Sequence, residues 1–167
     1  DDENFFMAEP FSGFLYTQKI GEEAVYLNPE VKERFETMKA LMLTPQEDEE
    51  NKSSTDWANF AEQVCARAKE NPDNKSLIPT EGTDEDLLTA YFKQFDGVVN
   101  DLREAAKRPW HFYPASYENG YGTLLPHLGI VKWCSQLLQQ SSTFKLHRGD
   151  SKGAMADIRL LFRLYTS

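Results

Sequence analysis

The fold of this chain is decided by residues 126–165, which read PHLGIVKWCSQLLQQSSTFKLHRGDSKGAMADIRLLFRLY. Apolar side chains recur at helical spacing in both halves of this stretch. They are Leu128, Val131, Leu138 and Phe144 in the first half, and Ala154, Ile158, Leu161, Phe162 and Tyr165 in the second. Between the halves, Gly149 suits the residue that ends one helix, and Asp150 suits the N-cap of the next. The stretch therefore predicts an antiparallel helical hairpin.

Three further helices are predicted upstream of the hairpin. Residues 28–44 begin with an Asn N-cap and a Pro at the first helical position. Residues 55–71 begin with a Thr cap and carry an apolar face. Residues 83–108 begin with a Thr cap and three acids in the first turn, and they form the longest helical pattern, in which a bend at Gly97 is allowed.

These patterns predict an all-α fold of about five helices, with the C-terminal αα-hairpin packed on the long central helix 84–107. A length of 167 residues and an apolar content of 40% suit a single helical domain, 1–167. Residues 45–54 are almost entirely polar and are predicted to form a mobile acidic loop. No run of eighteen apolar residues occurs, so no segment of this sequence is expected to span a membrane.

The net charge of −9 is distributed unevenly along the chain. Residues 1–120 carry 25 acids against 12 Lys and Arg, whereas residues 121–167 carry 2 acids against 6. An acidic chain is a poor partner for phosphate backbones, which makes nucleic-acid binding an unfavoured function.

The two cysteines, Cys65 and Cys134, are too few for a disulfide scaffold. Two buried thiols are expected, and a single disulfide bridge between them is left open.

The connection between the long helix and the hairpin, residues 108–126, is rich in aromatic side chains. Three prolines restrict its backbone, so we expect it to be ordered. Its rings suit either packing or ligand contact, and the candidate binding residues for a protein or glycan partner are Trp110, His111, Tyr113, Tyr117 and Tyr121. Within the loop, Trp110 and Phe112 are expected to pack inward, whereas Tyr117 and Tyr121 are expected to remain partly exposed.

Other residues that could carry chemistry are weaker candidates. His111 and His127 could converge with Glu118 or Asp101 on a metal or in proton transfer, but packing roles are favoured and no metal or other cofactor is expected. The acidic pairs Asp84/Asp86 and Asp96/Asp101 are ordinarily helix-capping groups. A basic stripe on the last helix suits a solvated face more than an anionic docking surface; it consists of Lys152, Arg159 and Arg163.

Several short elements in residues 86–165 resemble an uncharacterised bacterial family of helical proteins. The elements are Leu102-Arg-Glu-Ala-Ala-Lys-Arg-Pro109, Phe112-Tyr113-Pro114, Tyr117-Glu118, Leu125-Pro126-His127-Leu128, and Gly149-Asp150 with Ala154 and Asp157. The hairpin is also similar to one unit of tetratricopeptide-like repeats. The family resemblance implies an extracytoplasmic location, periplasmic or membrane-anchored, with any anchor outside this sequence. It implies no activity.

The leading functional hypothesis is a non-enzymatic extracytoplasmic domain that binds a protein or glycan through the aromatic loop. The alternative is an exported hydrolase, of peptidase or glycosidase type, that uses Asp, Glu or His near the same loop as acid and base. Perturbed pKa values on two convergent groups in a cleft would favour the hydrolase.

Overall fold

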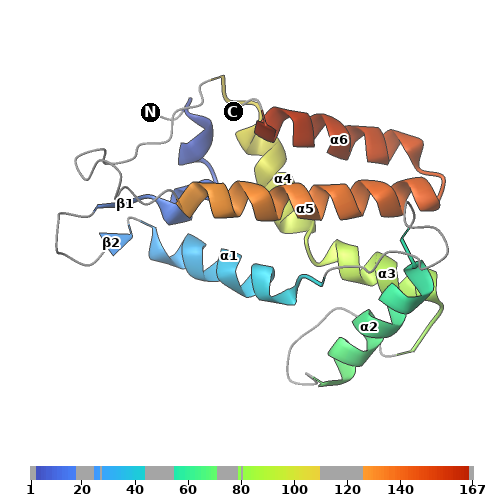
Figure 1. Ribbon diagram of the computed structural model, residues 1–167. Helices are drawn as coiled ribbons and strands as arrows, with labels where there is room; N and C mark the ends of the chain where they lie inside the picture. Colours follow the sequence, from blue (N-terminus) through green and yellow to red (C-terminus); the bar gives the residue numbers. More distant parts are fainter. Residues whose placement is uncertain are drawn as a thin grey trace. The chain divides into compact units, whose positions relative to one another are not determined.

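The computed structural model describes residues 3–17, 25–26, 28–43, 55–70, 79, 81–109 and 126–165. Its elements, in chain order, are η1 (Phe5–Met7), η2 (Phe11–Phe14), β1 (Tyr16–Thr17), β2 (Val25–Tyr26), α1 (Pro29–Leu41), α2 (Trp57–Glu70), α3 (Asp84–Lys93), α4 (Asp96–Ala105), α5 (Pro126–His147) and α6 (Ser151–Tyr165) (Figure 1). Helices dominate, so the predicted all-α fold is confirmed. The predicted acidic loop 45–54 lies outside the described residues.

The chain divides into two compact units. The first unit contains residues 1–41 and 98–167, and the second contains residues 42–97. Each unit therefore has its own packing, and the first is built from two separate stretches of sequence. The expectation of a single domain stays a prediction.

Residues 84–107 form two helices where one long helix was predicted. The interruption lies at Gln94 and Phe95, between α3 and α4, and not at Gly97, which is the second residue of α4. At the interruption, the Phe95 amide donates a hydrogen bond to the carbonyl of Phe92. This i to i−3 bond is typical of a 3₁₀ turn, which often ends an α-helix. Phe95 is fully buried, so tertiary packing accompanies the break.

Helices α5 and α6 form a C-terminal hairpin, and its likeness to a tetratricopeptide-like pair stays a prediction. Helices α5 and α6 lie side by side in Figure 1 and are joined by three residues. Gly149 has a φ of +78°, and the amides of Gly149 and Asp150 donate back to the carbonyls of Leu146 and Lys145 at 2.9 and 2.8 Å. This pattern is a Schellman motif, in which glycine adopts the left-handed conformation at little cost. Asp150 then caps α6 by accepting from the Gly153 amide at 2.8 Å.

The N-terminal segment forms an aromatic cluster in the first unit. Phe5, Phe6 and Phe11 are buried, and their ring centroids lie 4.7 to 5.4 Å apart. Gly13 in η2 approaches the backbone of α1 so closely that a Cβ atom would come within 2.6 Å of the Lys32 amide nitrogen. Glycine is therefore required at this position for the segment to pack on α1. β1 and β2 add a two-residue antiparallel ladder, which is too short to be recognised by alternation.

The face of α6 that packs inward differs from the predicted one. Its buried residues are Ala154, Asp157, Leu160 and Leu164. Of the residues expected to pack, only Ala154 is buried; Ile158 and Leu161 are half-buried, and Phe162 and Tyr165 are exposed by 65% and 68%. The inward face includes a charged residue, Asp157, which is fully buried and which an apolar pattern alone could not place there.

The second unit is held together by aromatic packing between α2 and α3. The rings of Phe60 and Tyr91 meet edge to face with centroids 5.3 Å apart, and Tyr91 makes a similar contact with Phe95. The Tyr91 hydroxyl accepts from the Leu43 amide at 2.7 Å, which satisfies the polar end of a buried ring. Burial raises the pKa of Tyr91 to about 12, and the Leu43 hydrogen bond partly opposes this shift.

Candidate functional site

The residues predicted from sequence to bind a partner lie outside the described residues. They are Trp110, His111, Tyr113, Tyr117 and Tyr121 in the predicted loop 108–126. The roles predicted for them therefore stay predictions. The described residues next to this loop, at the end of α4 and on the hairpin, define a different candidate surface.

Asp157 is the most constrained polar group of the hairpin. Its side chain is fully buried, and three donors surround its carboxylate. Ser141 Oγ of α5 donates to Oδ2 at 2.7 Å, Lys145 of α5 pairs with the same oxygen, and Arg103 Nη2 of α4 lies 3.3 Å from Oδ1. A buried carboxylate is tolerated when it is paired and hydrogen-bonded. Asp157 therefore joins α6 to α5 and α4.

Arg163 makes a second link between α6 and the rest of the first unit. Its Nη2 donates to the carbonyl oxygen of Arg108 at 3.0 Å, which places a cation at the end of α4. Arg108 in turn donates from Nη1 to the carbonyl of Asn4 at 3.2 Å. The predicted solvated stripe is thus wrong at Arg163, which is half-buried and structural, whereas Lys152 and Arg159 are exposed.

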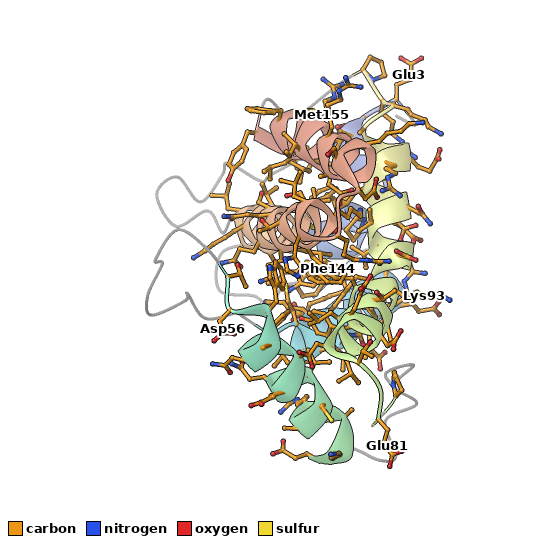
Figure 2. All side chains as sticks on the ribbon, turned by 90° about the vertical axis from the view of Figure 1, so that its right-hand side faces the viewer. Glu3, Asp56, Glu81, Lys93, Phe144 and Met155 are labelled. Atoms are coloured by element: carbon orange, nitrogen blue, oxygen red, sulfur yellow. The ribbon has the colours of Figure 1, made fainter. Side chains whose placement is uncertain are left out.

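With Asp157 turned inward, α6 presents two parallel stripes to the outside. One stripe is apolar and follows the spacing i, i+3, i+7, i+10. It consists of Met155, Ile158, Phe162 and Tyr165, with Met155 labelled in Figure 2. Beside it, Lys152 and Arg159 lie seven residues apart on one face. We call these two stripes together the α6 surface.

The α6 surface has no exposed carboxylate within its helix. Asp157 is the only acid of α6 and is buried, and α5 contains no Asp or Glu. Residues 126–165 hold six Lys and Arg against two acids, of which the second, Asp150, accepts the capping hydrogen bond at the start of α6. The hairpin sequence therefore carries a net charge of +4, six Lys and Arg against two acids.

One carboxylate of each acidic pair, Asp86 in the first and Asp101 in the second, has a structural partner. Asp86 forms a capping box with Thr83, whose side-chain and backbone hydrogen bonds hold the pKa of Asp86 below its ordinary value. Asp101 Oδ2 lies 3.4 Å from Arg34 Nη2, and Arg34 also pairs with Glu9. Desolvation raises the pKa of Asp101, Arg34 opposes the shift, and Glu9 adds to it. These contacts are those of caps and ion pairs that join structural elements.

Neither cysteine forms a disulfide bond. Cys134 in α5 is buried, as expected, and burial raises the pKa of its thiol, which keeps it protonated. Cys65 in α2 is half-buried. The bridge left open by the sequence is therefore absent, and Cys134 serves as a small apolar packing residue.

Comparisons with protein-family models, curated proteins and solved structures found no match. Within the described ranges, no three His, Cys, Asp or Glu side chains are grouped as a metal site would require. No helix in the same ranges combines the length and apolar character needed to cross a membrane.

Sequence reasoning missed the α6 surface because it placed Phe162 and Tyr165 in the core. One signal could have revealed it. Asp157 lies three residues after Ala154 and three before Leu160, in the middle of the face that is buried. A lysine or arginine on the preceding helix, such as Lys145, is the partner that allows an aspartate to occupy such a face.

Proposed function

We propose that this chain is a non-enzymatic binding domain for a protein partner and that the α6 surface is its contact site. The observation that carries the proposal is the exposure of Met155, Phe162 and Tyr165 on one helix, by 49%, 65% and 68%. Aromatic and methionine side chains are enriched at protein interfaces, and contiguous exposed apolar surface is uncommon on soluble domains. Exposed basic side chains beside them add an electrostatic component.

The structural roles of nearby groups support a rigid contact surface. Asp157 and Arg163 hold α6 against α5 and α4 through ion pairing and hydrogen bonding. The Gly149 turn fixes the start of the helix. A pre-organised helix loses little conformational entropy on binding, so its exposed side chains contribute more of their contact energy to affinity.

The aromatic loop 108–126 is proposed as a second contact, for the same protein or for a glycan. This part of the proposal rests on its sequence, above all on Tyr117 and Tyr121. An extracytoplasmic location is proposed on the family resemblance alone. The hydrolase alternative stays a proposal from the sequence, in which Asp86 and Asp101 are the weaker candidates because they are engaged with Thr83 and Arg34.

Site-specific photocrosslinking in the native cells tests the proposal. A photoreactive phenylalanine analogue replaces Phe162 in one variant and the exposed Met7 in a control variant. We expect a discrete protein adduct from position 162 and none from position 7. Absence of a protein adduct at position 162, with both variants folded and expressed, would overturn the proposed function.

A further inference from the structure

The chemistry of the α6 surface specifies the kind of partner that it fits. Resting on the proposed function, we infer that the α6 surface binds an acidic amphipathic helix of the partner protein. Three properties of α6 support this partner. Its exposed apolar residues lie on one side of the helix, they extend over nearly three turns, and the exposed charges beside them are positive.

The apolar stripe follows one side of α6. Met155, Phe162 and Tyr165 are exposed along one line of the helix, and the half-buried Ile158 lies between them. From position 155 to position 165 the helix rises by about 15 Å, or nearly three turns. A stripe of this size matches the apolar face of one partner helix of similar length, which would contribute residues at i, i+3, i+4 and i+7.

The positive charge beside the stripe favours a partner with negative charge. Lys152 and Arg159 are exposed beside the apolar stripe, and the only acid of α6, Asp157, is buried. Glu or Asp residues flanking the apolar face of a partner helix would meet these cations at the interface. Basic residues in the same places would meet like charge, which disfavours binding.

The charge of the remaining chain favours a narrow acidic helix over an extended anionic surface such as a bilayer. Residues 1–120 carry a net charge of −13, whereas residues 121–167 carry +4. An anionic bilayer would attract the hairpin but repel the acidic majority of the chain wherever the two come within about a Debye length of 8 Å. A single helix docked along α6 involves mainly the basic part.

Synthetic peptides provide the direct probe. Three capped and fluorescently labelled peptides of about eighteen residues are compared by anisotropy with the full chain. The first has Leu at one helical face and Glu elsewhere, the second has the same composition with the Leu residues dispersed, and the third has Lys in place of Glu. We expect the first to bind at least about tenfold more tightly than either of the others, and to weaken as salt is raised.

Variants of the chain test whether the peptide occupies α6. The double substitution K152E/R159E should weaken binding of the first peptide by about tenfold or more. The matched control K69E/K93E changes the net charge equally at exposed positions of α2 and α3, and it should alter affinity by less than about twofold. Phe162→Ser should also weaken binding, whereas Met7→Ser should not. Circular dichroism verifies that each variant retains its helical content.

Each contrary outcome has a definite meaning. Equal binding of the dispersed peptide or of the Lys peptide would overturn the inference, as would equal effects of the two double substitutions. If position 162 still crosslinks to a protein in that case, the proposed function stands and only the partner chemistry is wrong.

A last experiment measures binding to vesicles of phosphatidylcholine with about a quarter phosphatidylglycerol. Binding to them that depends on Arg159 and Phe162, without peptide binding, would assign the surface to membranes.

Discussion

Ser141 Oγ lies 2.7 Å from Oδ2 of Asp157 and donates a hydrogen bond to it across the interface between α5 and α6. The same carboxylate pairs with Lys145 and Arg103, so one aspartate without solvent contact connects three helices. Because Lys145 and Arg103 keep 28% and 44% of their side-chain surface exposed, each cation also remains partly hydrated. Hydration of the cations lowers the cost of burying the pair. Asp157 lies on the buried face of α6 together with Ala154, Leu160 and Leu164.

Asp157→Ala should destabilise the first unit. The substitution removes the acceptor for Ser141 and leaves two cations next to a buried cavity, although both can turn toward water. We expect a loss of about 2–4 kcal/mol in the free energy of unfolding, measured by urea denaturation. Asp150→Ala, which removes only an exposed cap, should cost about 1 kcal/mol. Equal losses in the two variants would show that the buried network contributes little.

Gly13→Ala should destabilise the chain although it adds only a methyl group. The new Cβ would lie 2.6 Å from the Lys32 amide nitrogen and 2.9 Å from the Val31 carbonyl carbon, both of which are backbone atoms that cannot rotate away. We expect a cost of about 1–3 kcal/mol in thermal or urea unfolding. Gly97→Ala is the matched control, because a Cβ there meets nothing within 4 Å and alanine favours the helix. The control should be neutral or stabilising by up to about 1 kcal/mol.

Asp101 should make the fold less stable as pH rises through its titration. Desolvation raises its pKa in the folded state, so the folded chain binds this proton more tightly than the unfolded chain does. The contribution of Asp101 to the free energy of unfolding therefore falls as pH rises from the ordinary aspartate pKa through the raised one. Asp101→Asn removes this titration and with it this part of the pH dependence.

The measurement for Asp101 is the difference in unfolding free energy between the wild type and Asp101→Asn at several pH values. Relative to the variant, the wild type should gain stability as pH falls from about 7 to about 4. The charges of Glu9 and Arg34 both act on Asp101, so Glu9→Gln serves as a second background. A pH-independent difference in both backgrounds would contradict the raised pKa.

Replacing Tyr117 and Tyr121 together with Ala should weaken binding of a protein or glycan partner with little loss of thermal stability. Both rings are predicted from sequence to be partly exposed in the aromatic loop, so their removal should cost contact area and not core packing. Trp110→Ala, at a ring predicted to pack inward, is the comparison variant and should lower the melting temperature. Unfolding of the tyrosine double variant would instead make the loop a structural clasp.

Local features of the sequence determined the helices and the hairpin turn. Thr83 with Asp86 forms the predicted cap of α3, and Gly149 with Asp150 forms the predicted turn, because both motifs depend on residues within one helical turn. At α2 the cap is formed by Asp56, which accepts from the Asn59 amide, one residue after the predicted Thr55. The observed start of this helix therefore differs slightly from the predicted one, although the helix itself was predicted.

Only the tertiary structure decided the break at Gln94 and the orientation of α6. Periodicity places Phe162 and Tyr165 on an apolar face, but it cannot show that Arg103, 54 residues before Asp157, supplies a partner for a buried aspartate. Pairing over such a separation depends on how α4, α5 and α6 pack, which a local sequence pattern does not contain. The sequence by itself thus determined where the helices lie along the chain. The packing of α4, α5 and α6 decided which face of α6 is exposed to solvent, because the partners of the buried Asp157 come from α4 and α5.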